Sequence, residues 1–258
     1  MVTTAGDEIL VERRGSALVL RLNRPNRRNA INRALADHLS DAATLVETDP
    51  TIRAGVLISS TPGMFCAGGD LIAMAEGERF SPDGALGGLT NPGRTKPWIA
   101  AVDGPVLGGG LEMALACEMI VAADTASLGL PEPRRGILAA GGGVFRLPRA
   151  IPRAPAMEMV LTGRPIPAAR AYALGLVNAV TTWEHLLDAA LDLALGVADC
   201  APASVAESLA IARIAAETPE TDLDAMARDA LERLRLTHDH AEALAAFAEK
   251  RSPAWRAR

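Results

Sequence analysis

Apolar residues make up 49% of the 258 residues and charged residues 22%, which is typical of a globular chain that can bury one large core. A net charge of −5 argues against nucleic acid as the main partner. The first eight residues hold no basic stretch followed by an apolar run, so we expect no signal peptide. The most apolar stretch, residues 98–123, is broken by three acidic residues and by glycines, which predicts buried core and no membrane span.

The cysteines are few and far apart, and no two of them form a Cys-x-x-Cys motif: Cys66, Cys117 and Cys200. This pattern predicts neither a disulfide framework nor a zinc site, and it favours a reducing, cytoplasmic setting. We expect no metal and no separate cofactor. Cys66 lies beside a candidate active loop, but small buried packing is the expected role of all three cysteines.

The N-terminal half alternates between apolar runs and helical patterns. Residues 8–13 and 17–23 are joined by a short glycine turn and predict a β-hairpin. Apolar side chains at helical spacing over residues 35–46 then predict a helix. Short buried strands are predicted at residues 54–59, 98–102 and 119–122. Because a loop and a helical pattern follow each strand, we expect an α/β fold.

Residues 76–96 contain glycine, proline and serine with weak periodicity, which predicts a mobile loop or lid.

The C-terminal half is mostly helical. Further elements are expected as helices at 156–161, 168–174 and 185–198 and as a last short strand at 177–180. From Ser204 onward only helices are predicted, including an apolar stripe over residues 223–234 and a helix over 243–251. We expect a core over residues 1–198 and a helical region over residues 199–258 that packs on this core or on a neighbouring subunit.

A glycine-rich stretch, residues 108–112, ends in a glutamate. A helix that opens at Gly109 and Gly110 would direct free N–H groups and the positive end of its dipole outward, where an anion or a polarised carbonyl oxygen is stabilised. The helix body is apolar, so Glu112 would be a buried carboxylate, which is costly without a partner or a role. Glycines needed for tight packing, with Glu112 paired to an arginine, explain this segment equally well.

Two further segments carry weaker signals. Ala67, Gly68 and Gly69 offer a second set of N–H groups, while Asp70 is explained most simply as a helix cap. Glu132 follows Pro131 in a turn, and taken alone it is better explained as a helix-cap residue.

Three arginines, Arg24, Arg27 and Arg28, cluster in an otherwise acidic chain. A solvated patch is the simpler explanation. A phosphate contact is the functional one, because arginine suits multidentate phosphate binding.

Taken together and in this order, the motifs resemble the crotonase family, the enoyl-CoA hydratase/isomerase superfamily, and most closely its hydratases. The resemblance covers nearly the whole chain. Its motifs are Leu22-Asn23-Arg24-Pro25 with Asn29-Ala30, Phe65-Cys66-Ala67-Gly68-Gly69-Asp70-Leu71, Ala101-Val102-Asp103-Gly104, Gly108-Gly109-Gly110-Leu111-Glu112, Pro131-Glu132 with Gly136, Thr162-Gly163, Ala173-Leu174-Gly175-Leu176-Val177 and Phe247-Ala248-Glu249-Lys250-Arg251.

The resemblance implies an α/β fold, a spiral of β-β-α turns with a C-terminal helical trimerisation region, and assembly into trimers or dimers of trimers. It implies Glu112 and Glu132 as the catalytic pair and the backbone N–H groups of Ala67 and Gly109 as the oxyanion hole for an acyl-CoA thioester. The CoA-binding surface implied in the same way consists of Arg27, Arg28, Ala30, Gly68, Gly69, Asp70, Leu71, Phe247 and Lys250.

Two carboxylates fit syn addition of water across a 2,3-double bond, with one as the base for water and the other as the proton donor to the α carbon. One departure from the hydratase pattern is Ala140, which stands where many hydratases have glycine, and its methyl group would crowd the pocket. Three functions remain open. They are an enoyl-CoA hydratase, another crotonase-type lyase or isomerase such as a carnitinyl-CoA-like dehydratase, and a non-catalytic acyl-CoA binder, which the intact glutamate pair disfavours.

Overall fold

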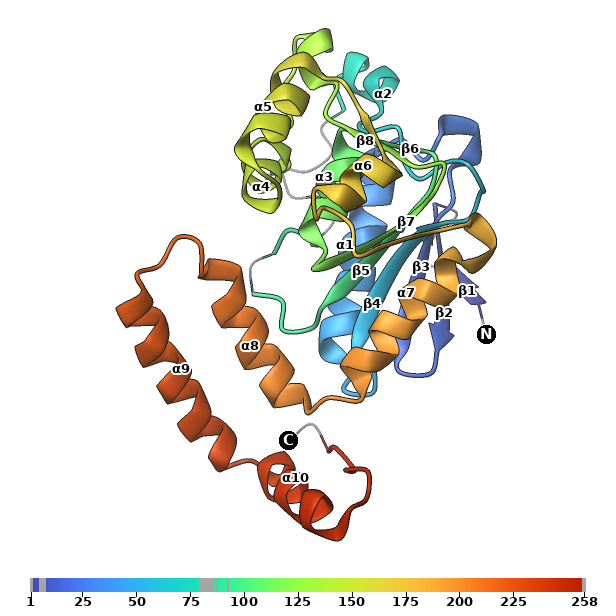
Figure 1. Cartoon of the computed structure of the whole chain (residues 1–258). Helices are drawn as coiled ribbons and strands as arrows, with labels where there is room; N and C mark the ends of the chain where they lie inside the picture. Colours follow the sequence, from blue (N-terminus) through green and yellow to red (C-terminus); the bar gives the residue numbers. More distant parts are fainter. Residues whose placement is uncertain (1, 5–7, 79–85, 87, 92, 257–258) are drawn as a thin grey trace.

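The computed structural model describes residues 2–4, 8–78, 86, 88–91 and 93–256, and all structural statements below concern these residues (Figure 1). The chain forms an α/β fold with one large and one small sheet. The large sheet has the strand order β1-β2-β3-β4-β5-β7-β10. Its strands are β1 (Val2–Thr4), β2 (Ile9–Arg14), β3 (Ala17–Leu22), β4 (Ala54–Ser59), β5 (Trp98–Val102), β7 (Met119–Ala123) and β10 (Ala179–Thr181).

The first three strands pair antiparallel and the rest of the large sheet is parallel. The predicted hairpin is confirmed as β2 and β3, and β4 and β5 begin and end where the sequence predicts. The expected strand at 177–180 is displaced. Val177 is buried in the core and Asn178 bonds Ile120 through both its N–H and its side-chain oxygen, so pairing with β7 starts only at Ala179.

The small sheet comprises β6 (Pro105–Leu107), β8 (Ser127–Gly129) and β9 (Ile166–Pro167). β5 and β7 are parallel neighbours in the large sheet, while β6 and β8 are parallel neighbours in the small one. Two successive turns of the chain, β5-β6-α3 and β7-β8-η2, therefore pass from the large sheet to the small sheet and then into a helical segment. This arrangement confirms the β-β-α spiral implied by the motifs.

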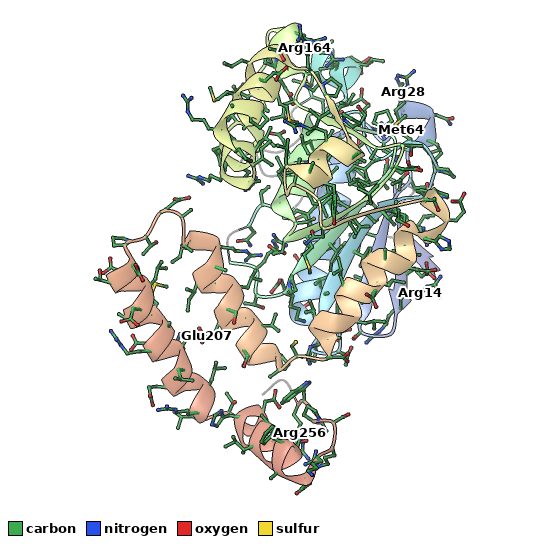
Figure 2. All side chains as sticks on the ribbon, viewed as in Figure 1. Arg14, Arg28, Met64, Arg164, Glu207 and Arg256 are labelled. Carbon is green, nitrogen blue, oxygen red and sulfur yellow. The ribbon has the colours of Figure 1, made fainter. Side chains whose placement is uncertain are left out.

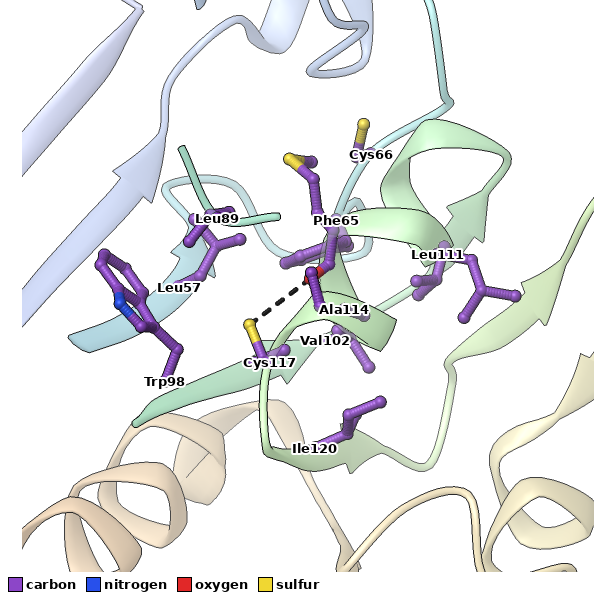
Figure 3. Close-up of a cluster of buried hydrophobic side chains, with 14 of the residues drawn as sticks. Leu57, Phe65, Cys66, Leu89, Trp98, Val102, Leu111, Ala114, Cys117 and Ile120 are labelled. Carbon is purple, nitrogen blue, oxygen red and sulfur yellow. Dashed lines mark hydrogen bonds between the residues drawn. The ribbon is translucent and has the colours of Figure 1, made fainter. Parts of the chain in front are cut away.

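Helices cover both faces of the large sheet (Figure 1). α7 (Trp183–Ala198) packs on one face against alternate strand residues such as Val56 and Ile99. α1 (Arg33–Thr48) and α3 (Gly109–Ala116) pack on the other face, where Phe65, Trp98 and Leu111 are fully buried (Figure 3). Shorter helical segments complete the core: η1 (Pro25–Arg27), α2 (Leu71–Ala75), η2 (Glu132–Arg135), α4 (Gly143–Ala150), α5 (Arg153–Thr162) and α6 (Ala168–Ala173).

The last three helices, α8 (Pro202–Ile214), α9 (Glu220–Arg235) and α10 (His238–Glu249), lead away from the sheets, as Figures 1 and 2 show. Arg233 of α9 binds Glu207 of α8 through two hydrogen bonds of 2.8 Å. The apolar stripe predicted on α9 is largely uncovered within one chain, since Ala230 is buried but Leu231 is 45% exposed. Leu236 and Phe247 are 88% and 87% exposed.

Among the described residues, no single helix is both long enough and apolar enough to cross a membrane, and α7 and α8 meet those criteria only as a joined pair bent by 108°. The loop or lid expected over residues 76–96 lies partly outside the described residues, at 79–85, 87 and 92. Within the described part, Leu86 and Leu89 are buried.

Candidate active site

The loop that carries Ala67, Gly68 and Gly69 is held by the segment after β3. Asn29 is fully buried, and its side-chain amide donates to the Phe65 carbonyl and to the Ser59 hydroxyl, both at 2.9 Å. Arg28 and Asn29 both adopt left-handed backbone conformations, with φ of 52° and 51°, which few non-glycine residues adopt. The hydrogen bonds of Asn29 therefore stabilise a strained turn that supports the candidate loop. Asn29 was predicted only as part of a motif, with no role of its own.

Asp70 closes this loop and begins α2. Its carboxylate accepts from the N–H groups of Ile72 and Ala73, so the predicted cap is present. Arg24 donates to the same carboxylate at 3.2 Å and also to the Ala30 carbonyl. Against the effect of burial, these contacts hold the pKa of Asp70 below its usual value. Arg24 thus fixes the loop and is not part of a free basic patch.

The N-terminus of α3 packs tightly against this loop. A methyl group at residue 110 would lie 2.7 Å from the Cys66 carbonyl oxygen, so only glycine fits there. Gly109 is the first residue of the helix, as predicted. A methyl group at residue 68 would lie 3.5 Å from the backbone nitrogen of Gly109. The two glycine-rich segments, which are about forty residues apart in sequence, therefore meet at one point.

At this meeting point the N–H groups of Gly69 and Gly109 have no acceptor among the described residues and can bind an oxygen atom. Ala67 is not such a donor, because its N–H donates to the Arg28 carbonyl at 3.0 Å. Gly69 has no partner for its N–H among the described residues, and its nitrogen lies 3.6 Å from the position that a Gly109 β-carbon would take. The expectation that Ala67 forms the pair with Gly109 therefore does not fit this geometry, and Gly69 takes its place as the candidate donor.

Glu112 lies one turn into α3 and is 5% exposed. Its Oε1 accepts a 2.9 Å hydrogen bond from the N–H of Gly143, the first residue of α4. Burial raises the pKa of Glu112, the negative charge of Glu132 raises it further, and the Gly143 hydrogen bond opposes both effects. Among the described residues, no arginine forms an ion pair with Glu112, so the simple packing explanation of this residue is not supported.

Glu132 is the first residue of η2 and is 7% exposed. Its Oε1 would lie 2.7 Å from a β-carbon at Gly108, the residue that precedes α3. Its Oε2 is buried without a hydrogen-bond partner in the described part of the chain. Burial raises the pKa of Glu132, although its own backbone N–H and Arg135 lower it. The second carboxylate therefore faces the N-terminus of α3 with one oxygen free.

A cavity of about 420 Å³ gathers most of the predicted site residues. The predicted residues in its lining are Arg27, Arg28, Ala30, Ala67, Gly68, Gly69, Asp70, Leu71 and Glu132. Asn26 and Arg135 also line it and were not predicted. Arg27 and Arg28 are exposed at its edge, which suits contact with a charged ligand.

Phe247 and Lys250 are not brought to this cavity by their own chain. Both belong to the end of α10, which lies far from α2 and α3 (Figure 1). Lys250 is exposed and takes a left-handed conformation as the cap residue of α10. Their predicted role in CoA binding therefore requires the α10 of another copy of the chain, and it stays a prediction.

Cysteine and metal chemistry find no support in the geometry. All three cysteines are free thiols, and burial raises the pKa of Cys66 and of Cys117 to about 12, so neither is a reactive thiolate. No group of three or more His, Cys, Asp or Glu side chains is arranged to hold a metal ion in the described part of the chain.

Contrary to expectation, the Ala140 methyl group does not crowd the site. It is exposed, it is absent from the cavity lining, and its N–H donates to the Leu138 carbonyl at 2.8 Å. The backbone atoms beside the Glu112 carboxylate belong instead to Gly141 and Gly143. A methyl group at residue 141 would lie 2.9 Å from Glu112 Oε2, so glycine is needed at that position.

Fold and site together define an α/β protein with two buried carboxylates beside two converging backbone donors. The family model described as enoyl-CoA hydratase/isomerase matches residues 12–258. The chain belongs to this family, as its motifs predict.

Individual relatives agree with this assignment. The carnitinyl-CoA dehydratase of Proteus mirabilis (strain HI4320) is 39% identical over 253 residues, which cover 95% of this chain and 97% of that protein. The carnitinyl-CoA dehydratase of Escherichia coli (strain K12) is 37% identical over 260 residues, covering 98% and 99%. The crystal structure of an enoyl-CoA hydratase from Mycobacterium tuberculosis H37Rv gives a TM-score of 0.93 at 39% identity and covers 98% of this chain and 100% of that one.

Proposed function

We propose that this protein is a hydro-lyase that adds water reversibly, in syn fashion, to the 2,3-double bond of an enoyl-CoA thioester. The observation that carries the proposal is the pair of buried carboxylates near the donors Gly69 and Gly109: Glu112 lies one turn into α3, and Glu132 faces the N-terminus of the same helix. Raised pKa values on both glutamates are what proton transfer near neutral pH requires.

The surroundings of each carboxylate favour different roles. Glu112 accepts a hydrogen bond from the first N–H of α4, and a helix N-terminus stabilises negative charge, so Glu112 is the base that takes a proton from water. Glu132 is buried with one oxygen unpartnered among the described residues, which favours its protonated form. Glu132 is therefore the acid.

In the hydration direction, the water oxygen bonds to C3 while Glu112 accepts the proton that water releases. The π electrons move onto the thioester oxygen, where the N–H groups of Gly69 and Gly109 stabilise the enolate. Glu132 then transfers its proton to C2 as the carbonyl re-forms. Exchange of one proton from Glu112 to Glu132 restores the starting state, and the reverse sequence is dehydration.

The CoA portion is expected in the cavity that Arg27 and Arg28 border, where its phosphates meet two guanidinium groups. Binding of CoA away from the reacting carbons supplies orientation. Phe247 and Lys250 would reach this CoA from a neighbouring copy. The exposed apolar side chains of α9 and α10 support self-association, for which we propose the trimer or dimer of trimers implied by the motifs.

The test is an activity screen with trans-2-enoyl-CoA thioesters of increasing chain length, followed by loss of the conjugated thioester absorbance. Reaction in D₂O should place deuterium on C2 and a hydroxyl group on C3. Conversion of 3-enoyl to 2-enoyl thioesters without hydration would indicate an isomerase instead. Binding of acyl-CoA without any turnover across the series would leave a non-catalytic binder.

A further inference from the structure

A second cavity, of about 550 Å³, lies at the C-terminal end of α3, opposite to the end that meets Gly69. Its walls come from the end of α3, from α4, from α8 and from the segment before β5. The charged residues of its lining are Arg94, Arg146, Arg149, Arg213, Glu118 and Glu217. Four guanidinium groups thus face two carboxylates.

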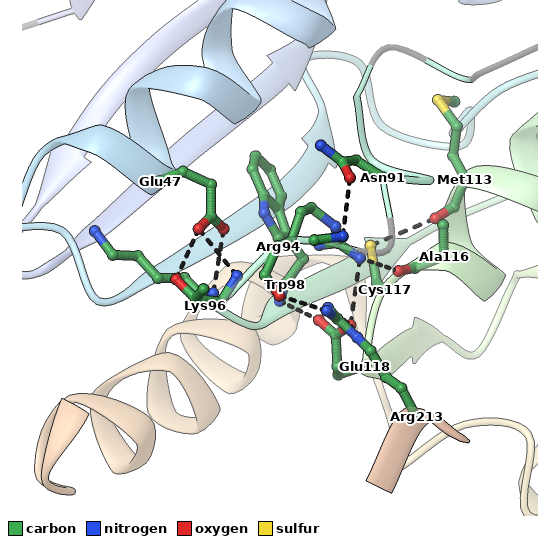
Figure 4. A network of polar contacts seen from close by, with 12 residues as sticks. Glu47, Asn91, Arg94, Lys96, Trp98, Met113, Ala116, Cys117, Glu118 and Arg213 are labelled. Atoms are coloured by element: carbon green, nitrogen blue, oxygen red, sulfur yellow. Dashed lines mark hydrogen bonds and ion pairs between the residues drawn. The ribbon is translucent and has the colours of Figure 1, made fainter. Parts of the chain in front are cut away.

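Arg94 and Arg213 share one of these carboxylates (Figure 4). Arg94 Nη2 lies 3.3 Å and Arg213 Nη2 lies 2.5 Å from the same Glu118 oxygen. The Arg94 side chain is 4% exposed, and its Nε and Nη1 have no hydrogen-bond partner among the described residues. Because a buried guanidinium with unpaired N–H groups is costly, Glu118 alone does not compensate the charge of this pair.

Arg146 adds a further positive charge, which is attracted by Glu112 and lies with its Cζ 5.1 Å from the centroid of the Phe145 ring. Its Nη1 donates to the Gly141 carbonyl at 2.8 Å, and within the described residues it forms no ion pair with a carboxylate. Arg149, by contrast, pairs with Glu217 at 2.6 Å. Burial lowers the pKa of Arg146, and the positive charges of Arg94 and Arg149 lower it further against the attraction of Glu112. The cavity therefore holds positive charge in excess.

Gly141 connects one residue of this cavity with Glu112. Gly141 offers its carbonyl to Arg146, while a β-carbon on the same residue would lie 2.9 Å from Glu112 Oε2. Along α3, Gly109 and Ala116 are separated by about 10 Å at 1.5 Å per residue. Arg146, which lines the cavity, is thus linked to Glu112 through Gly141.

We propose that the arginine-lined cavity receives the far end of the acyl group and that the preferred acyl group ends in a carboxylate. The proposal rests on the proposed function and names the substrate class of that site. A carboxylate would occupy a region of surplus positive charge and gain charge-assisted hydrogen bonds. A trimethylammonium end, as in the carnitinyl group, would meet repulsion there, so this chain would differ in substrate from the carnitinyl-CoA dehydratases that it resembles in sequence.

The experiment compares three acyl-CoA thioesters of equal chain length that end in a methyl group, a carboxylate or a trimethylammonium group. Dissociation constants of the saturated thioesters, measured by calorimetry, give the selectivity without turnover, and kcat/KM for the 2-enoyl forms gives it with turnover. The variants are Arg146→Met and Arg94→Met. Arg170→Met, at an exposed arginine of α6 outside the cavity, is the matched control.

The intact protein and the Arg170 variant should bind the carboxylate form about ten- to hundredfold more tightly than the methyl form. The Arg146 variant should lose most of this preference and bind the trimethylammonium form better than the intact protein does. Equal binding of all three forms by the intact protein, or a preference that survives both cavity substitutions, overturns the proposal. Failure of every 2-enoyl form to be hydrated contradicts only the proposed function, because the binding ratio still decides the inference. If Arg94→Met does not fold, Arg146→Met decides alone.

Discussion

Replacing Glu132 by glutamine keeps the size of the side chain and removes its ability to give a proton to carbon. The same substitution at Glu112 removes the base but lets the amide oxygen keep the 2.9 Å hydrogen bond from Gly143. Both changes therefore test proton transfer with little change in packing. General acid–base catalysis contributes about 10²–10⁴-fold, or about 3–5 kcal/mol of barrier, so we expect each variant to lose kcat by that factor.

The double variant should lose far less than the product of the two single losses, because groups that act on one reaction as a unit are not additive. Binding of the CoA thioester should change little, because the phosphates are expected at Arg27 and Arg28. The assay is loss of the conjugated enoyl thioester absorbance under saturating substrate, with calorimetric binding of a saturated thioester as the control.

The pH dependence gives an independent check on the two roles. Hydration needs Glu112 ionised and Glu132 protonated, so kcat/KM should rise and then fall with pH. The two apparent pKa values of this profile belong to the coupled pair and not to either residue alone. Burial raises the pKa of both groups, so the profile should lie above the ordinary glutamate range. Glu132→Gln should remove the alkaline limb. Intact hydration in Glu132→Gln beside complete loss in Glu112→Gln would refute the two-carboxylate mechanism and favour a one-carboxylate reaction such as isomerisation.

Three further predictions concern stability, assembly and ligand binding. Burial raises the pKa of Glu132, so the contribution of its protonated form to stability is fully present below the ordinary glutamate pKa and is lost as pH rises through the pKa of the folded state. Glu132→Gln should therefore raise the melting temperature at pH 8 but not at pH 4. An equal change at both pH values would contradict this. Light scattering at micromolar concentration should give a trimer or a multiple of it, and Phe247→Asp with Leu236→Asp should reduce the mass, whereas a monomeric native protein would exclude the proposed assembly. Replacing Arg27 and Arg28 by alanine should weaken CoA binding more at low salt than at high salt, because exposed charges are screened, and equal weakening at all salt concentrations would indicate a folding defect.

Strands β2, β3, β4, β5 and β7 and the opening of α3 could be predicted because their signals are local, whereas the short strands β6, β8 and β9 were not predicted. β4 and β5 are short, fully buried apolar runs, and such runs differ from their surroundings in any window of sequence. α4 has no such signal. It begins at the third of three consecutive glycines and contains Pro148, two features that normally argue against a helix, yet its first N–H binds Glu112. For that reason α4 was not predicted from the sequence.

The choice between Ala67 and Gly69 as a donor also depends on tertiary structure. Both residues lie in one run of small residues, and the sequence gives them similar freedom. What separates them is a hydrogen bond from Ala67 to Arg28, which lies about forty residues earlier and is held in an unusual turn by Asn29. Contacts of this range leave no periodic pattern, so only the folded chain assigns the donor.

Helix α3 connects the three parts of the proposed chemistry. In the proposed complex, its first N–H faces the thioester oxygen and Glu112 lies one turn later beside the reacting carbons, while its last residues border the arginine-lined cavity. Because these parts lie in sequence along one rigid axis, a substrate bound by its carbonyl at Gly109 has its C3 and its far end positioned by the same helix. Changes at Glu112 should therefore alter the chemical step for every acyl group, while changes at Arg146 should alter which acyl groups bind. Separate effects of changes at Glu112 and at Arg146 would be hard to explain if the arginines served only to hold α8 against the core.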